Sequence, residues 1–242
     1  MIRRTLATAA AAVGIAALLP LTASAQVGPV LPKHAEATSK AQAAGVCNLS
    51  VPTRVAIGRP ELNLYGKVSG DCNRAGNSSG WYLMHPASAE PVNGILFDAT
   101  DTDYGNGRWE VPSYHYIGAM NFVGAFSENA DGATYTQNKV PVTVKLAAGA
   151  WISSSRKADV VTLKGTSLLY SVNNNNFFKR SAGGVFQFRE KGQTNWQTLK
   201  SVYTNSKGEV SLSYRYSKVR DYRFSLYSTS ISWDLGSAVT SR

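Results

Sequence analysis

The sequence is poor in the residues from which enzymes usually build reactive sites. It contains three histidines, two cysteines and three methionines among 242 residues. No histidine has a second potential ligand at metal-binding spacing, and no G-x-S-x-G, glycine-rich phosphate loop or H-E-x-x-H string occurs. The sequence does not exclude a pair of catalytic carboxylates of the kind that glycosidases use, because such partners need not be close in sequence. The residue content nevertheless favours a protein that is not an enzyme.

Long apolar runs are absent except at the N-terminus. Arg3 and Arg4 precede an alanine-rich apolar run, Leu6–Leu21, and the small residues Ala23–Ala25 follow it. This order is typical of a cleaved export signal and not of a membrane span. We therefore expect a signal peptide over residues 1–25, a secreted, extracellular mature chain that begins at Gln26, and no membrane span.

Cysteine is limited to one possible pair in the exported chain. Cys47 and Cys72 are the two cysteines, and an even number in an oxidising compartment favours a disulfide over a catalytic thiol. Such a bridge closes a loop of about 25 residues, which the chain-entropy model values at roughly 3.5 kcal/mol.

Acidic residues are scarce in one half of the chain. The formal net charge is +10, yet residues 46–146 carry 7 Lys and Arg against 9 Asp and Glu, whereas residues 147–242 carry 14 against 5. A basic second half attracts anionic polymers. We expect an anionic cell-wall polymer as its partner rather than nucleic acid, because no nucleic-acid motif is present and secretion removes the usual partner. The oligomeric state stays open.

Helical periodicity is also absent, and short apolar-alternating runs take its place. They are rich in Val, Tyr, Phe and Thr and are separated by Gly, Asn, Ser and Asp, which is typical of strands. Residues 26–45 show neither period and are predicted to form a flexible leader. The predicted strands are Val51–Ile57, Glu61–Val68, Gly80–His85, Val92–Asp98, Arg108–Tyr116, Met120–Phe126, Lys139–Lys145, Trp151–Ser153, Val160–Tyr170, Gly184–Arg189, Trp196–Tyr203, Glu209–Tyr216, Tyr222–Tyr227 and Ser237–Thr240.

One pattern occurs twice and divides the chain. Leu96–Val111 and Leu199–Leu212 each read as a strand, a polar turn with a glycine, and a second strand, and the glycines are Gly107 and Gly208. A recurrence about one hundred residues apart predicts two similar domains, 46–146 and 147–242. Seven short strands in each favour two tandem antiparallel β-sandwiches.

Several short strings carry a family resemblance: Leu64–Val68, Leu163–Thr166, Trp196–Leu199 and Tyr222–Phe224. Their order around a glycine-containing turn resembles the tandem immunoglobulin-like repeats of secreted high-GC Gram-positive bacterial proteins. The resemblance covers nearly all of residues 47–242, and it implies adhesion, spacing or binding in the envelope without shared catalytic residues. The chain departs from antibody domains because no cysteine pair bridges its two sheets.

Acidic residues gather in the predicted loops at one end of the first domain. In a sandwich of this order the loops after strands two, four and six meet at the end where Cys47 and Cys72 would pair. Calcium prefers several oxygen ligands on a turning backbone. The candidate ligands are Asp71, Asp98, Asp101, Asp103, Asn106 and Asp131. The same residues fit a hairpin with solubilising acids, and the second copy of the turn, which has a lysine and no carboxylate, favours that interpretation.

A second candidate site lies in the second domain. Phe177, Phe178, Lys179 and Arg180 follow an asparagine run, and Trp233 lies in a later loop. Aromatic rings beside cations can bind sugars or polyanions. Because this end should face the first domain, burial of the three aromatic side chains at the joint is the preferred alternative.

The other aromatic residues are predicted to serve the fold. The pairs Tyr114/Tyr116 and Tyr214/Tyr216 recur at matched places, so packing in or near the core is expected, as it is for Trp81 and Trp109.

The sequence therefore predicts a secreted binding, adhesion or spacer protein near the cell envelope. Its partner would be an anionic wall polymer or a secreted or surface protein. The alternatives are an inhibitor or regulator of an extracellular enzyme, which would present the disulfide-pinned tip, and a calcium-binding module. No cofactor is expected apart from that possible calcium.

Overall fold

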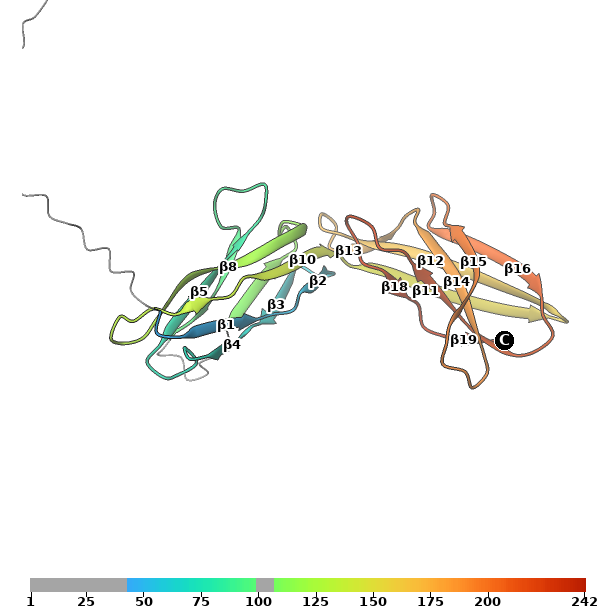
Figure 1. The fold of residues 1–242 in the computed structure, drawn as a ribbon. Coiled ribbons are helices and arrows are strands. Elements are labelled where there is room, and N and C mark those ends of the chain that lie inside the picture. The colour runs from blue at the N-terminus through green and yellow to red at the C-terminus, as the bar shows by residue number, and fades with distance from the viewer. Residues whose placement is uncertain (1–42, 99–106) are drawn as a thin grey trace, which may run out of the picture. The chain divides into compact units, whose positions relative to one another are not determined.

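A computed structural model describes residues 43–98 and 107–242, and in these residues the fold is all-β (Figure 1). The described part of the chain contains no helix capable of crossing a membrane. The first ten strands are β1 (Val46–Ser50), β2 (Arg54–Ile57), β3 (Glu61–Tyr65), β4 (Lys67–Gly70), β5 (Ser78–Met84), β6 (Asn93–Phe97), β7 (Arg108–Pro112), β8 (Gly118–Glu128), β9 (Thr136–Gln137) and β10 (Val140–Leu146). The remaining strands are β11 (Ala148–Lys157), β12 (Val160–Ser171), β13 (Asn176–Lys179), β14 (Gly183–Glu190), β15 (Gln197–Tyr203), β16 (Glu209–Arg215), β17 (Arg220–Leu226), β18 (Leu235–Gly236) and β19 (Thr240–Ser241).

Strands β1–β10 form a sandwich. One layer is the five-stranded sheet β2-β10-β8-β5-β6, and the other consists of β4-β1-β9 and the pair β3-β7. Inward side chains from both layers form one apolar cluster, which includes Trp81 and Phe122 on one side and Leu49 and Trp109 on the other. Trp109 is fully buried and Trp81 is 1% exposed, so the prediction that both belong to the core is confirmed.

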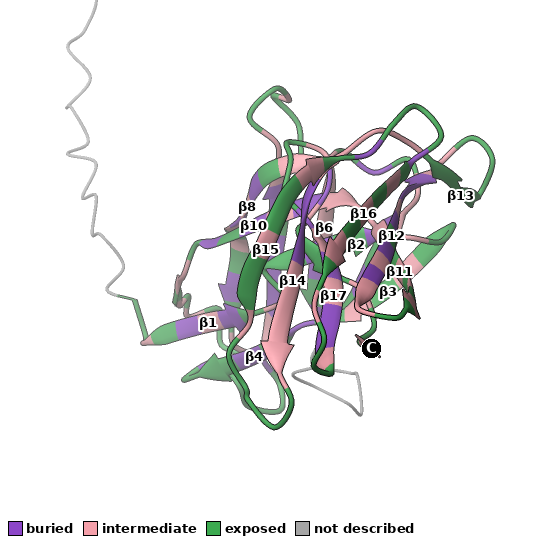
Figure 2. Cartoon of the chain, turned by 90° about the vertical axis from the view of Figure 1, so that its right-hand side faces the viewer, coloured by how far each residue is buried: buried purple, intermediate pink, exposed green. Residues whose placement is uncertain are grey.

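Strands β11–β19 form a second sandwich with its own apolar cluster. β12 pairs with β11, β13 and β16, while β14 and β17 are the central strands of β15-β14-β17-β18. Ala150, Leu163, Phe186 and Phe224 are among the buried residues that join the two layers. The buried residues lie mainly on β12, β14 and β17, whereas β13 and β15 are largely exposed (Figure 2).

The two sandwiches share one order of strand pairing. β3 pairs with β7 as β12 pairs with β16, and β5 lies between β6 and β8 as β14 lies between β15 and β17. This is an immunoglobulin-like order, and the expected sandwich class is confirmed. The pairing is not wholly antiparallel, because β1 pairs with β9 and β10 pairs with β2 in parallel.

In each copy of the repeat, the strands on either side of the turn pair in different sheets and do not form a hairpin. β6 pairs with β5 and β7 pairs with β3; likewise β15 pairs with β14 and β16 pairs with β12. The hairpin prediction was therefore wrong, although both copies cross in the same way. Gly208 has φ +70°, a left-handed turn conformation, whereas a Cβ on Gly107 would lie 2.7 Å from Ile95.

Candidate functional site

The disulfide pins the predicted tip of the first sandwich. Cys47 and Cys72 are bonded, both are fully buried, and their Cα atoms are 5.2 Å apart. Cys47 Sγ lies 3.3 Å from Ser79 Oγ, which is 2.7 Å from Ser127 Oγ. Ser79 is also the register partner of Phe97, so the ends of β6 and β8 meet beside the disulfide. The predicted pairing is confirmed.

The candidate calcium ligands are only partly visible. Asp101, Asp103 and Asn106 lie outside the described residues. Asp71 accepts a hydrogen bond from the Val46 amide at 2.9 Å, and Asp131 lies exposed in a turn whose amides bond to Asn129. Asp98 is exposed directly after β6. Within residues 43–98 and 107–242 no group of three or more His, Cys, Asp or Glu side chains could hold a metal ion. Calcium binding stays a prediction.

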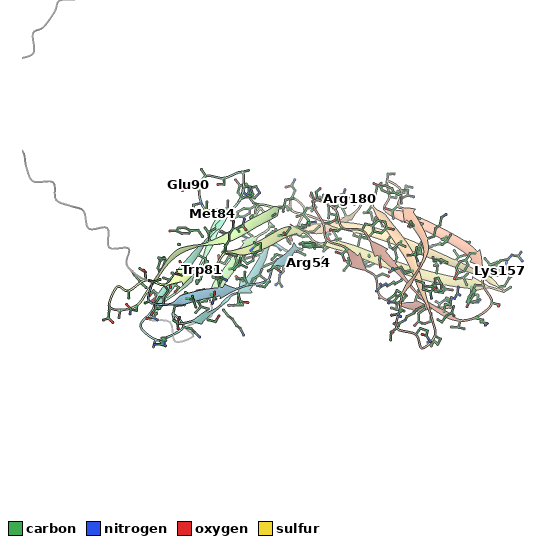
Figure 3. All side chains as sticks on the ribbon, viewed as in Figure 1. Arg54, Trp81, Met84, Glu90, Lys157 and Arg180 are labelled. Atoms are coloured by element: carbon green, nitrogen blue, oxygen red, sulfur yellow. A yellow bond between two sulfur atoms is a disulfide. The ribbon has the colours of Figure 1, made fainter. Side chains whose placement is uncertain are left out.

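The second predicted site does not form one cluster of rings. Residues 176–179 are strand β13 rather than loop, because they pair with the end of β12. Phe177 and Phe178 are 38% and 44% exposed, and Phe177 packs its edge against Tyr170, 5.7 Å between ring centroids. Arg180, labelled in Figure 3, follows β13, and its backbone amide and carbonyl bond to Ser167.

Trp233 does not join Phe177 and Phe178 in one cluster but contacts the first sandwich. Its Nε1–H donates to the Val55 carbonyl at 2.9 Å, and its ring is covered by Arg54 at 4.1 Å and Lys145 at 4.4 Å from the centroid. Arg54 also pairs with Asp234 at 2.7 Å. These contacts therefore cover the half-buried Trp233 ring.

The two tyrosine pairs differ in how far they are buried. Tyr114 and Tyr116 are 83% and 53% exposed, so the prediction that they pack in the core or half-buried beside it was wrong. β7 ends at Pro112, and the His115 amide bonds to the Pro112 carbonyl at 3.0 Å, which turns the chain and places His115 inside. Tyr214 and Tyr216 are half-buried against the second core, as predicted.

Charge distribution distinguishes the second sandwich most clearly. All five of its carboxylates are in ion pairs: Asp159 with Arg215, Glu190 with Arg220, Glu209 with Lys179, Asp221 with Arg189 and Lys191, and Asp234 with Arg54. Residues 147–242, all of which the structure describes, therefore keep nine cationic side chains with no recorded ion pair. They are Arg156, Lys157, Lys164, Arg180, Lys200, Lys207, Lys218, Arg223 and Arg242.

The Glu190 cluster illustrates how the acids are neutralised. Arg220 Nε donates to Glu190 at 2.6 Å, and the Tyr216 hydroxyl donates to both carboxylate oxygens at 3.1 Å. The hydrogen bond from Arg220 lowers the pKa of Glu190, so the carboxylate stays ionised. The Arg220 guanidinium also covers the Tyr216 ring at 3.4 Å. This cluster fixes neighbouring strands and leaves Arg220 unavailable to a polyanion.

An apolar hollow on the first sandwich was missed by the sequence reasoning. Tyr82, Leu96 and Phe126 are 50%, 55% and 40% exposed on neighbouring strands β5, β6 and β8, around a cavity of about 370 Å³. Gly80, Gly94 and Arg108 also line it. Alternation with the buried residues Trp81 and Ile95 would have placed Tyr82 and Leu96 outward, but only the register brings them together.

No family model matches the sequence, and no curated protein matches it. Solved structures with similar regions include trypsin-activated alpha-2-macroglobulin from Escherichia coli, at 11% identity and a TM-score of 0.30 over 82% of this chain; the match spans only 15% of that protein. A marsupial T cell receptor matches at 10% identity and a TM-score of 0.33, over 81% of this chain and 72% of the receptor. The D00-D0 domain of intimin matches at 13% identity and a TM-score of 0.25, over 81% of this chain and 98% of that domain. TM-scores of this size carry no inference about function.

Proposed function

We propose that this chain is a secreted, non-enzymatic binding or adhesion protein of the cell envelope, and that its second sandwich holds anionic wall polymers. The observation that carries the proposal is the ion pairing of residues 147–242. Every side-chain carboxylate there is paired with a cation, and nine Lys and Arg side chains have no carboxylate partner. Five of the nine are lysines, whereas Arg156, Arg180, Arg223 and Arg242 already donate hydrogen bonds within the chain. Complementary charge of this kind steers and holds a polymer of opposite sign.

The same proposal treats residues 46–146 and 147–242 as two domains and assigns polymer binding to the second. Two separate apolar clusters and the repeated strand order support two domains, although Tyr170 of the second sandwich packs into the first cluster. The Cys47–Cys72 disulfide supports an oxidising, extracellular compartment. The export signal itself lies in residues 1–25, outside the described part of the chain.

Sedimentation with purified cell-wall fragments tests this function. The Debye length falls from about 10 Å at 0.1 M salt to roughly 4 Å at 0.5 M, so exposed charges should lose most of their attraction. We expect the chain to sediment with walls at 0.05 M salt and to be released at 0.5 M. Walls stripped of their anionic polymers are the control, and equal binding to stripped walls would contradict the proposal.

The runner-up is an inhibitor or regulator of an extracellular enzyme that presents the tip of the first sandwich. The favouring observation is that the Cys47–Cys72 disulfide and the Ser79–Ser127 hydrogen bond hold the neighbouring strands in place, and such preorganisation lowers the entropic cost of binding. A panel of secreted proteases assayed with and without the chain tests it. Calorimetry with calcium tests the metal-binding alternative. If calcium produces no heat and no change in melting temperature, that alternative is contradicted.

A further inference from the structure

On one face of the second sandwich, half of the outward residues carry small hydroxyl side chains. It is the outer face of β11, β12 and β16. The inward residues on these strands, among them Val161, Leu163 and Leu212, pack into the core, so the residues between them point outward. The outward residues, read across the three strands, form four rows: Trp151–Thr166–Glu209, Ser153–Lys164–Ser211, Ser155–Thr162–Ser213 and Lys157–Val160–Arg215.

The rows make a regular array of hydrogen-bonding groups. Neighbouring strands lie about 4.8 Å apart and successive outward residues about 6.7 Å apart along a strand, so a hydroxyl recurs in both directions. Thr162 Oγ1 lies 2.8 Å from Ser213 Oγ, and Ser211 Oγ bonds to the Leu163 carbonyl at 3.3 Å. Because Ser and Thr are short, the surface between the longer residues stays low. Open hollows of about 410 and 150 Å³ share the central residues Ser153 and Lys164.

The charges of this face are positive where they are not already paired. Glu209 is bound by Lys179 at 2.6 Å, and Arg215 lies 3.6 Å from Asp159. Lys164, in the middle of the array, and Lys157, at the end of β11 and labelled in Figure 3, have no recorded ion pair in the described part of the chain. The face therefore carries two ammonium groups without an ion pair: Lys164 among the hydroxyls, close enough to Glu209 to lower the pKa of that carboxyl, and Lys157 in the row with Val160 and Arg215. Its remaining charge is positive and complements an anionic chain rather than a neutral one.

Trp151 completes the face with an exposed ring. Of the five tryptophans, all within the described residues, Trp81 and Trp109 are buried. Trp233 is covered by two cations, and the Trp196 ring is contacted by Arg189 at 4.7 Å and Arg223 at 4.4 Å from its centroid. Trp151 is 63% exposed, and the structure records no ring or cation contact for it within residues 43–98 and 107–242. An indole ring that is open to solvent beside hydroxyl groups can stack on the apolar face of a sugar ring.

We propose that the outer face of β11, β12 and β16 is the binding site for a linear, carboxylate-bearing polysaccharide. Lys164 and Lys157 pair with carboxylates, the Ser and Thr hydroxyls exchange hydrogen bonds with sugar hydroxyls, and Trp151 stacks on one sugar ring. This assignment rests on the proposed function, since it names the surface and the ligand class of the charge-driven binding. It also adds a component that charge alone does not provide, namely recognition of the sugar ring.

Calorimetric titration of the full secreted chain with oligogalacturonate, and in parallel with inorganic polyphosphate, tests the site. Lys164→Gln has a matched control in Lys200→Gln, because Lys200 is an exposed, unpaired cation on β15 in the opposite sheet. Trp151→Ala has its control in Tyr203→Ala, a ring that is 71% exposed on β15. Circular dichroism and melting temperature confirm that each variant folds, as expected for exposed positions.

We expect Lys164→Gln to weaken oligogalacturonate binding about tenfold and Lys200→Gln less than about twofold, because only the former removes a cation at the site. Trp151→Ala should weaken oligogalacturonate binding by a similar factor without changing polyphosphate binding, Trp151→Phe should retain most of it, and Tyr203→Ala should have no effect.

Two results would overturn the site while leaving the proposed function in place. One is an equal loss of oligogalacturonate binding in Lys164→Gln and Lys200→Gln together with no effect of Trp151→Ala. That result would mean that the polymer is attracted by the charge of the whole domain and not by this face. The other is binding of polyphosphate but not of oligogalacturonate. Failure of the unsubstituted chain to bind either polymer would instead contradict the proposed function itself.

Discussion

His115 should make the first sandwich sensitive to acid. Its side chain is 8% exposed, Nδ1 lies 2.8 Å from the Tyr116 carbonyl, and Nε2 is buried without a hydrogen-bond partner. Burial lowers the pKa of His115 below its usual 6.5, the hydrogen bond to Tyr116 opposes this, and nearby His85 lowers it further. The neutral imidazole is therefore the form that the fold accepts.

The sign of the effect follows from proton binding. The unfolded chain takes up a proton near the ordinary pKa of 6.5, whereas the folded chain resists it. Stability is therefore complete above that pH and is lost as the pH falls toward the lower pKa of the folded state. At pH 5.5 the loss is at most about 1.4 kcal/mol, because one unit below the unfolded pKa corresponds to one factor of ten in proton binding.

Urea denaturation at pH 7.5 and 5.5 measures this loss. The variant His115→Gln removes the titrating group, so its free energy of unfolding should fall less between the two pH values, by up to about 1.4 kcal/mol. His85→Gln is the control for a partly exposed histidine, and it should retain most of the acid sensitivity. An identical drop in the unsubstituted chain and in His115→Gln would refute the reasoning.

Two further predictions concern the stability of each sandwich. Replacing Cys47 by Ser removes the bond to Cys72 and should lower the free energy of unfolding by about 3.5 kcal/mol; denaturation with and without reductant measures it, and a reductant effect on the variant itself would argue against this cause. Gly165→Ala should cost about 1–3 kcal/mol, because the added Cβ would lie 2.9 Å from the Phe224 ring in the second core. A thermal melt unchanged by Gly165→Ala would show that the Phe224 ring can move aside.

The parts of the fold that follow from local pattern were predictable. The buried tryptophans Trp81 and Trp109 and most strand positions follow from period-two alternation, and the cysteine pair follows from its number and compartment. Alternation does not determine which strand pairs with which. A strand looks the same whether it pairs with its neighbour in sequence or crosses to the other layer, which is why β6 and β7 were taken for a hairpin.

The ends of strands were harder to predict for a related reason. Alternation continues from β7 through Tyr114 and Tyr116, but the turn at Pro112 ends the pairing and exposes both rings. The residues of β13 were predicted as loop because the asparagine run before them is typical of a turn, yet the long strand β12 extends far enough to pair with them. The hydroxyl face was not visible in sequence at all, since Ser153, Lys164 and Ser211 become neighbours only through the register of three strands.

Binding to isolated cell walls as a function of salt tests the central claim most directly. We expect the chain to sediment with intact walls at 0.05 M salt, and we expect binding to weaken steadily as salt rises and to be largely lost by about 0.5 M, where surface charges are screened. Residues 147–242, and not residues 46–146, should be responsible for that salt dependence. Binding that stays constant from 0.05 to about 0.5 M salt would contradict the account.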